Sequence, residues 1–135
     1  MLRNVLFIDD DRRLIQRYAR AVESRQCAVH REYDVDKALE YARATPRIDV
    51  IVWDMAMPPG KNFEEQETEG GLETGRFLYE ELRKAHPAAL FILLTGHVNE
   101  YDKKTFLHPD QRSHIFVKLT TSPESLAEFI TEKSP

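Results

Sequence analysis

The sequence predicts an α/β domain in which helices cover both faces of a parallel β-sheet. Short apolar runs recur along the chain without alternating polar residues, which is typical of strands buried on both faces. Amphipathic helical patterns lie between these runs, so that strand and helix alternate about five times. The length of 135 residues fits a single domain that spans residues 1–135.

The first half of the chain supplies two predicted strands and two predicted helices. The strands are apolar runs, of which the second is weaker and is expected at an edge of the sheet. The helices are indicated by apolar residues that share one face. In chain order these elements are Val5–Ile8, the stripe of Leu14, Ile15, Tyr18 and Val22, the run Cys27–Val29, and the stripe of Val35, Ala38, Leu39 and Ala42.

The second half supplies three further strands and three helices. The middle helix is the most polar of them, and the last one is short. In chain order these elements are Val50–Trp53, the stripe of Leu72, Gly75, Leu78, Tyr79 and Leu82, the run Leu90–Leu94, the helix Val98–Phe106, the run Ile115–Val117, and the stripe of Leu126, Phe129 and Ile130.

Composition excludes several classes of protein. The formal charge of −4 gives no electrostatic footprint for nucleic acid, so we expect no direct contact with DNA or RNA. Cys27 is the only cysteine, so an internal disulfide is impossible and nothing points to secretion. The apolar run at the N-terminus is too short for a signal peptide, and no segment is long enough to span a membrane. We therefore expect a cytoplasmic protein with no membrane contact.

Polar residues follow the strongest predicted strands. The first strand is followed by Asp9-Asp10-Asp11, the third by Asp54, the fourth ends at Thr95-Gly96, and the fifth is followed by Lys118. Parallel sheets bind ligands at the carboxyl ends of their strands, where the strand order reverses. The sequence therefore predicts that these residues share one rim.

Carboxylates that converge on one rim repel each other unless a cation balances them. Mg²⁺ prefers hard oxygen ligands and keeps water positions for a phosphate. Asp9, Asp10 and Asp54 together carry −3, and Mg²⁺ with Lys118 carries +3. Such a site suits phosphoryl transfer, with Asp54 as the nucleophile and with Lys118 and Thr95 stabilising the transferred group.

Each of these residues could also have a purely structural role. Asp10 or Asp11 could cap the following helix, and for Asp11 we prefer that role. Asp54 could open a turn that contains proline, Thr95 could be a turn residue, and Lys118 could be a solvated charge. Their occurrence together at successive strand ends favours the functional interpretation.

The chain resembles a response-regulator receiver domain over essentially its whole length. The segments that carry the resemblance are Val5-Leu6-Phe7-Ile8-Asp9-Asp10-Asp11, Val50-Ile51-Val52-Trp53-Asp54-Met55-Ala56-Met57-Pro58, Gly71-Leu72-Glu73, Leu93-Leu94-Thr95-Gly96 and Phe116-Val117-Lys118. The resemblance implies a flavodoxin-like, doubly wound sheet of five parallel strands in the order 2-1-3-4-5.

The resemblance also implies a function in two-component or phosphorelay signalling. Asp54 would accept phosphate from a histidine kinase or phosphotransfer protein and would switch contacts with a downstream protein target. Mg²⁺ would bind Asp9, Asp10, Asp54 and the backbone carbonyl of Ala56, while Thr95 and Lys118 would contact the phosphoryl group. Such a domain is a signalling phosphoacceptor rather than an enzyme.

Three features depart from the family pattern. Leu119 takes the place of the usual proline after the lysine, so the peptide is either a costly cis bond or the loop runs differently. Ile115 takes the place of the switch aromatic, and the neighbouring Phe116 should face the other side of the sheet. The acidic segment at about 55–70 is long for a strand-to-helix connection and carries Glu64, Glu65, Glu67 and Glu69. It is either a solvated loop or a recognition element beside the site.

Two other functions remain open on the sequence alone. A receiver-shaped docking module that works without phosphate is compatible with Ile115 and Leu119. A haloacid-dehalogenase-like phosphatase is suggested by Asp9-x-Asp11, Thr95 and Lys118 in that order. That family needs a later acidic metal-binding motif, whereas the 17 residues after Lys118 contain no aspartate.

Overall fold

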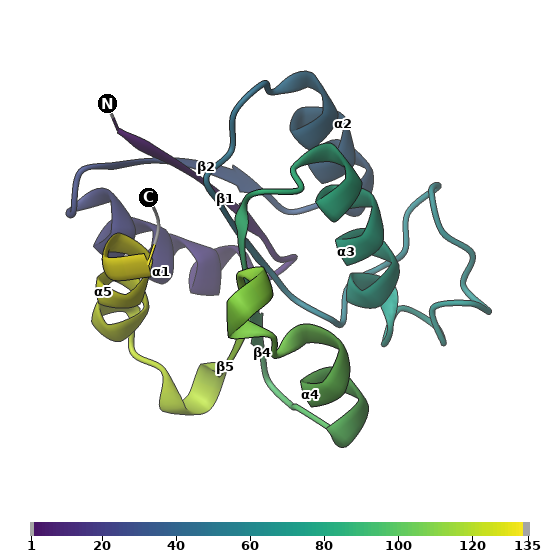
Figure 1. Cartoon of the computed structure of the whole chain (residues 1–135). Helices are drawn as coiled ribbons and strands as arrows, with labels where there is room; N and C mark the ends of the chain where they lie inside the picture. The colour runs from purple at the N-terminus through teal and green to yellow at the C-terminus, as the bar shows by residue number, and fades with distance from the viewer. Residues whose placement is uncertain (1, 134–135) are drawn as a thin grey trace.

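The computed structural model describes residues 2–133 and confirms the predicted α/β architecture. Five parallel strands form one sheet in the order β2-β1-β3-β4-β5 (Figure 1). The strands are β1 (Arg3–Ile8), β2 (Cys27–Glu32), β3 (Val50–Trp53), β4 (Leu90–Thr95) and β5 (Ser113–Val117). The helices are α1 (Arg12–Glu23), α2 (Val35–Ala44), α3 (Thr74–Ala85), α4 (Glu100–Phe106) and α5 (Pro123–Lys133). Cys27–Val29 lies at the edge of the sheet, as predicted.

Two separate hydrophobic cores lie on the two faces of the sheet. On one face α1 and α5 pack side by side and bury Ile15 and Leu126 against the strands. On the other face α2, α3 and α4 bury Leu39, Leu78 and Phe106. Figure 1 shows these two layers, with α1 and α5 to the left of the sheet and α2 and α3 to its right. Because both faces are covered, the central strands β1, β3 and β4 carry unbroken apolar runs in the sequence.

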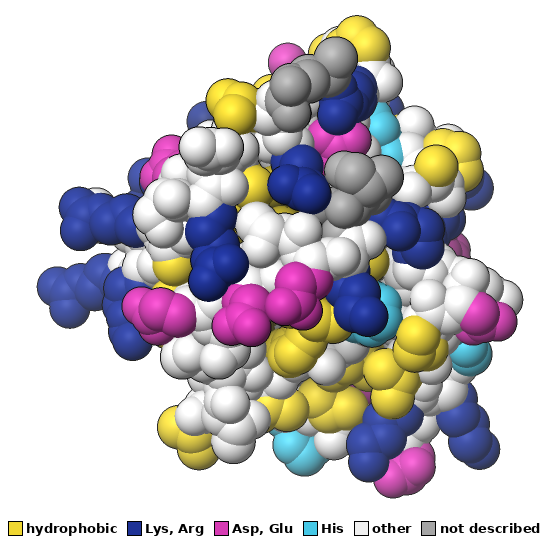
Figure 2. Space-filling view, turned by 60° about the vertical axis from the view of Figure 1, so that its left-hand side comes forward, with side chains coloured by type: hydrophobic (Ala, Val, Ile, Leu, Met, Phe, Trp, Pro, Cys, Tyr) yellow, Lys and Arg dark blue, Asp and Glu magenta, His cyan; other side chains and the backbone are white. Residues whose placement is uncertain are grey.

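Helix α1 begins at the rim that the sequence predicted. The Asp11 side chain accepts a hydrogen bond from the Leu14 amide at 3.1 Å, which is the N-cap role we expected for it. The outward side of this helix carries four exposed arginines: Arg12, Arg13, Arg17 and Arg20. Figure 2, which brings the side of the molecule with α1 and α5 forward, shows Lys and Arg side chains projecting at its margin.

Trp53 anchors the core beneath the rim. It is the last residue of β3, is 1% exposed and packs against the rings of Tyr79, Phe91 and Phe106. Its indole N–H donates to the Gly75 carbonyl at 3.0 Å. The residue that precedes Asp54 is therefore fixed to the first turn of α3, and this fixes the position of Asp54 as well.

The start of α3 was predicted wrongly. The sequence stripe began at Leu72, whereas the helix begins at Thr74 and Leu72 is 67% exposed. The close contact belongs to Gly75, because a Cβ there would lie 2.4 Å from the Asp54 carbonyl oxygen. The amide of Gly75 donates to the Met55 carbonyl at 2.7 Å, so this turn packs directly on the backbone of the rim.

The acidic connection between β3 and α3 projects beyond α3 and is held at its base (Figure 1). The Met57 amide donates to the Gly71 carbonyl at 3.0 Å, and the Thr74 hydroxyl donates to the Met57 carbonyl at 2.5 Å. On the side of α2, the Asp36 carboxylate accepts from the Lys61 amide at 2.8 Å. The connection therefore has defined anchors at α2 and α3.

Candidate functional site

The sheet brings three of the predicted residues into direct contact. Asp9 follows β1, Asp54 follows β3 and Lys118 follows β5, so all three lie at the carboxyl ends of their strands. The Lys118 amine lies 2.7 Å from Asp54 Oδ2 and 3.0 Å from Asp9 Oδ2. Asp9 and Asp54 are 4% and 6% exposed, so this is a buried group of two carboxylates bridged by one amine.

Backbone amides hold the other oxygen of each carboxylate. The Asp11 amide donates to Asp9 Oδ1 at 2.9 Å, and the Met55 amide donates to Asp54 Oδ1 at 2.7 Å. Both side chains are therefore fixed at two points, and neither depends on Lys118 alone for its orientation. Carboxylates held in this way keep their orientation before any ligand arrives.

The site is short of positive charge. Burial raises the pKa of Asp9 to about 6, and the negative charge of Asp54 adds to this rise. The Asp11 amide and Lys118 oppose the rise without cancelling it. Burial by itself would lower the pKa of Lys118, but the hydrogen bond and the charge of Asp54, together with Asp9, raise it overall. The amine is therefore a firm cation, and one cation does not fully compensate two buried carboxylates.

The donor set fits a hard divalent cation in part. Two fixed carboxylates with excess negative charge match the chemistry of Mg²⁺, which binds through one or two carboxylates and keeps waters for a phosphate. Asp10 and Ala56 are both exposed at the same rim. Among residues 2–133, however, no group of three or more His, Cys, Asp or Glu side chains is placed to hold a metal ion. Asp10 therefore stands apart from the pair that meets at Lys118.

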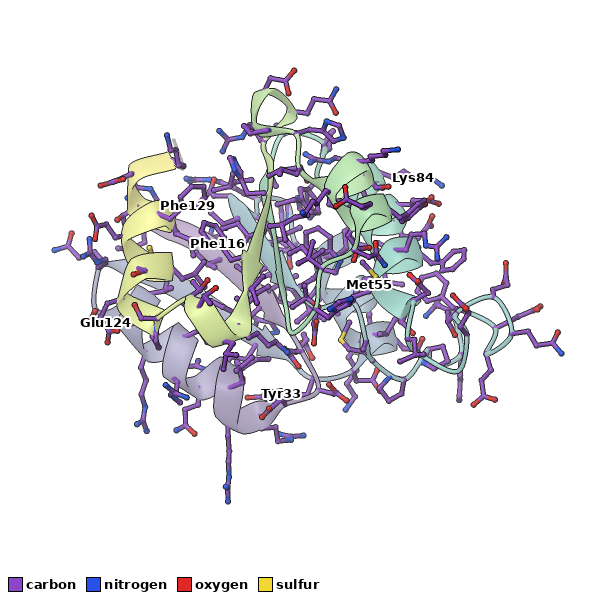
Figure 3. All side chains as sticks on the ribbon, turned by 90° about the horizontal axis from the view of Figure 1, so that it is seen from below. Tyr33, Met55, Lys84, Phe116, Glu124 and Phe129 are labelled. Atoms are coloured by element: carbon purple, nitrogen blue, oxygen red, sulfur yellow. The ribbon has the colours of Figure 1, made fainter. Side chains whose placement is uncertain are left out.

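Thr95 ends β4 beside the last residue of β5, Val117, and is 5% exposed. In the described part of the chain its hydroxyl makes no hydrogen bond. Ile115 lies on the core face that includes α4, whereas Phe116 packs against Phe129 of α5 at 4.8 Å between ring centroids. Figure 3, which views the molecule from the end where the rim lies, shows Phe116 directed toward Phe129. The expected opposition of Ile115 and Phe116 is confirmed.

The loop after Lys118 runs without a cis peptide. No cis bond occurs in the described range, and residues Lys118–Thr120 form a single 3₁₀ turn. Leu119 is 94% exposed in this turn. The sequence left open either a cis peptide between Lys118 and Leu119 or a loop that runs differently, and the structure has the second.

Sequence reasoning missed one residue of this region, Tyr18. It was assigned only to the apolar stripe of the first helix, and its ring does lie in that core. Its hydroxyl, however, contacts the loop after β5 at the carbonyl of Thr121. The signal available in the sequence was a tyrosine in place of an aliphatic residue, because a buried tyrosine needs a partner for its hydroxyl.

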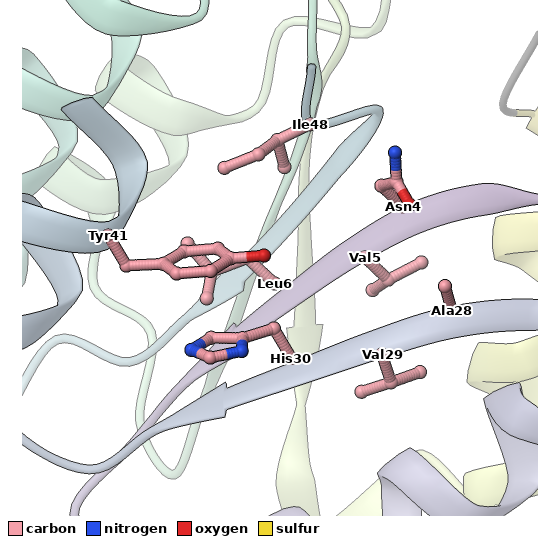
Figure 4. A pocket seen from close by; sticks show the side chains of 8 residues that line it. All are labelled: Asn4, Val5, Leu6, Ala28, Val29, His30, Tyr41 and Ile48. Carbon is pink, nitrogen blue, oxygen red and sulfur yellow. The ribbon is translucent and has the colours of Figure 1, made fainter. Parts of the chain in front are cut away.

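A cavity of about 180 Å³ lies at the opposite end of the sheet (Figure 4). It is lined by Asn4, Ala28 and Ile48, and by the rings of His30 and Tyr41, which stack at 3.6 Å. Asn4 and Ala28 lie at the amino ends of their strands, whereas Asp9 and Asp54 follow the carboxyl ends. The cavity is therefore separate from the candidate site.

No protein-family model matches the sequence, and a search of curated proteins finds no match. Solved structures do match. A response regulator receiver domain protein (CheY-like) from Methanospirillum hungatei shares 19% identity at a TM-score of 0.76, over 98% of this chain and 94% of that one. The chemotaxis response regulator CheY4 of Vibrio cholerae shares 20% identity at a TM-score of 0.73, over 98% of each chain.

A third match bears on the chemistry of such folds. A response regulator from Burkholderia pseudomallei, solved with a phosphorylated aspartic acid, a calcium ion and citrate, shares 22% identity at a TM-score of 0.69. The match covers 96% of this chain and 71% of that one. The comparisons establish the fold of this chain, which is the fold of receiver domains. Within residues 2–133, no helix is long and apolar enough to cross a membrane.

Proposed function

We propose that this chain, which has the receiver fold, is a phosphoacceptor that takes a phosphoryl group on Asp54. The observation that carries the proposal is the contact of one lysine amine with two buried carboxylates, at 2.7 Å to Asp54 and 3.0 Å to Asp9. This constellation lies at the rim where sheets of this type bind ligands. We propose a two-component or phosphorelay context, with a histidine kinase or phosphotransfer protein as donor and a downstream protein as target.

Asp54 is the nucleophile in this proposal. One of its carboxylate oxygens attacks the phosphorus of the donor, and an O–P bond forms as the bond from phosphorus to the leaving atom breaks. The bonding electrons leave with that atom, which is the imidazole nitrogen of a phosphohistidine or the carboxyl oxygen of acetyl phosphate. The Met55 amide keeps Asp54 oriented, since it holds Oδ1 at 2.7 Å.

Lys118 and Thr95 act on the transferred group. The amine moves from its contact with Asp54 Oδ2 to the phosphoryl oxygens, whose charge it neutralises. The Thr95 hydroxyl donates to another of these oxygens. Because Asp9 also contacts the amine, Lys118 keeps one carboxylate partner throughout the transfer.

We propose Asp9, Asp10, Asp54 and the Ala56 carbonyl as the residues that would hold Mg²⁺. The ion would neutralise charge on the phosphoryl oxygens. Asp9 would be the central ligand, because its carboxylate is buried, fixed by the Asp11 amide and short of positive charge. Asp10 would reach the ion from the exposed side of the rim. The domain would thus be a cytoplasmic signalling phosphoacceptor rather than an enzyme.

A docking module that works without phosphate is the second candidate. Ile115 and the exposed Leu119 favour it, because they replace the residues that couple phosphorylation to the surface in the family the sequence resembles. The phosphatase alternative is weaker, since the Asp11 side chain is engaged as the N-cap of α1. An acid that protonates a leaving group would have to be free of that contact.

The test is labelling by acetyl phosphate with Mg²⁺, followed by mass spectrometry of the intact protein and its peptides. We expect one phosphoryl adduct on Asp54, its absence when EDTA replaces Mg²⁺, and its absence in Asp54→Asn. The control is Asp110→Asn, which changes an exposed carboxylate on another turn and should label normally. Full labelling of Asp54→Asn would refute the site, and an unlabelled wild type would favour the docking module.

A further inference from the structure

The position of Lys118 depends on the turn that follows it. Residues Lys118–Thr120 form one 3₁₀ turn that closes with a long hydrogen bond, from the Thr121 amide to the Lys118 carbonyl at 3.5 Å. The turn contains no proline, and its middle residue, Leu119, is 94% exposed. The Thr120 hydroxyl adds only a second long hydrogen bond, to the Val117 carbonyl at 3.5 Å, so the turn itself supplies little that would fix the backbone of Lys118.

Tyr18 supplies a contact from outside the turn. Its hydroxyl donates to the Thr121 carbonyl at 2.5 Å, and its oxygen lies 3.4 Å from the Lys118 carbonyl. The hydroxyl thus lies at both ends of the turn, whose residues Lys118 and Thr121 are 100 and 103 positions away along the chain. The ring is 3% exposed in the core between α1 and the sheet, so the donor itself has little freedom to move.

We propose that Tyr18 is a positioning residue for Lys118. By holding the end of the 3₁₀ turn at the Thr121 carbonyl, its hydroxyl sets the direction from which the Lys118 side chain enters the rim. That direction lets one amine reach Asp54 and Asp9 together. The expected effect on the rate of phosphoryl transfer rests on the proposed function. The expected effect on the position of Lys118 does not.

A loss of the hydroxyl alone separates positioning from packing. Tyr18→Phe keeps the buried ring and removes only the donor, so the turn loses its external contact while the core remains filled. Tyr41→Phe is the matched control, because that half-buried tyrosine lies at the far cavity and its hydroxyl makes no hydrogen bond within residues 2–133. A general effect of removing a tyrosine hydroxyl would appear in both variants.

The first measurement follows the Lys118 ammonium group directly, by ¹H–¹⁵N correlation spectra of lysine side chains in metal-free buffer. Two contacts to buried carboxylates should slow its proton exchange, and Lys118→Arg assigns the signal. We expect the signal in the wild type and in Tyr41→Phe, and its loss or a clear shift in Tyr18→Phe. An unchanged signal in Tyr18→Phe overturns the proposal, whether or not the protein accepts phosphate.

The second measurement is the rate of labelling by acetyl phosphate with Mg²⁺, at a temperature where urea titrations show every variant to be fully folded. We expect Tyr18→Phe to label roughly tenfold more slowly, as a misplaced group at a reacting centre does, and Tyr41→Phe to match the wild type. Equal rates for Tyr18→Phe and wild type contradict the proposal. A wild type that takes no label refutes the proposed function, and the spectra then decide the role of Tyr18.

Discussion

At the scale of single residues, the site is a balance of three charges in which the carboxylates outnumber the amine. Lys118 contacts Asp54 and Asp9 at 2.7 and 3.0 Å, yet the pKa of Asp9 still rises to about 6. The cause is burial first and the charge of Asp54 second. Folding therefore binds a proton to Asp9 in a pH range where the unfolded chain, with the ordinary pKa of 3.8, has lost it.

This shift predicts a pH dependence of stability without metal. Because the native pKa is raised, the contribution of Asp9 is fully present below about 4 and is lost as the pH rises through 6. Relative to Asp9→Asn, the free energy of unfolding of the wild type should therefore be about 1 kcal/mol greater at pH 5 than at pH 7.5. Urea titrations in EDTA measure the difference.

Comparison with Asp9→Asn cancels the titrating groups that do not interact with Asp9. His114, whose pKa is lowered by burial and by Lys133 and Arg112, titrates in both proteins alike. The same pH dependence in the wild type and in Asp9→Asn would show that Asp9 has an ordinary pKa. The local charge balance described above would then be incorrect.

At the scale of elements, the strands could be predicted and the start of α3 could not. Runs such as Val50–Trp53 are apolar without interruption because helices cover both faces, so pattern alone identified them. Gly71 and Leu72 resemble a helix start in sequence, but Leu72 points to solvent. The helix start is decided by Gly75 against the backbone of Asp54, which is a contact between segments and leaves no periodic signal.

The candidate site was also predictable from the sequence only in part. Asp9, Asp54 and Lys118 were predictable, because each follows a strand and the rule for parallel sheets brings them together. Asp9 and Asp54 meet at the Lys118 amine, whereas Asp10 stays exposed. This difference depends on the directions of the side chains, which the position of a residue at a strand end does not specify. Tyr18 was hidden because a residue in an apolar stripe is assigned to the core, and one side chain here serves both core and loop.

The contact at Gly75 predicts a selective effect of a single methyl group. In Gly75→Ala the new Cβ would lie 2.4 Å from the Asp54 oxygen and 2.5 Å from the Met55 Cα, so α3 or the rim must shift. We expect a loss of roughly 1–3 kcal/mol in the free energy of unfolding. Labelling of Asp54 should slow as well, because the displaced backbone carries the proposed nucleophile.

Gly96→Ala is the matched control for this change. Gly96 also lies at the rim, directly after β4, but a Cβ there would have no neighbour within 4 Å. Its effect on stability should stay within about 0.5 kcal/mol. A Gly75→Ala protein as stable as the Gly96→Ala protein would show that α3 is not packed against the backbone of Asp54.

At the scale of the whole molecule, opposite charges flank the site. The exposed arginines of α1 begin at the rim on one side, and the connection after Asp54 carries four exposed glutamates on the other. The net charge of −4 conceals this separation. A charged donor that approaches Asp54 therefore meets a local field which the overall composition does not reveal.

This arrangement predicts that the glutamates slow small anionic donors. Changing Glu64, Glu65, Glu67 and Glu69 to Gln should speed labelling by acetyl phosphate roughly two- to fivefold at low ionic strength. The difference should disappear in about 0.5 M salt, because screening shortens the reach of the field. Labelling rates over a salt series measure this effect.

A second set of four glutamates provides the control for net charge. Glu40, Glu80, Glu128 and Glu132 are exposed on α2, α3 and α5, and changing them to Gln alters the net charge equally. That protein should label like the wild type at every salt concentration. If both sets of changes act alike, the charge of the whole molecule and not the connection sets the rate.

The hydrogen bonds that close the base of the β3–α3 connection have a consequence for protein engineering. Met57 is tied to Gly71 and Thr74, so the chain leaves the domain and returns to it at nearly the same place. Segments whose two ends meet tolerate insertion well, since extending a closed loop costs little entropy. Within this connection Phe63 packs against the core and Thr68 is fully buried, so the exposed residues 64–67 are the suitable site for grafting a foreign peptide while the two cores stay intact.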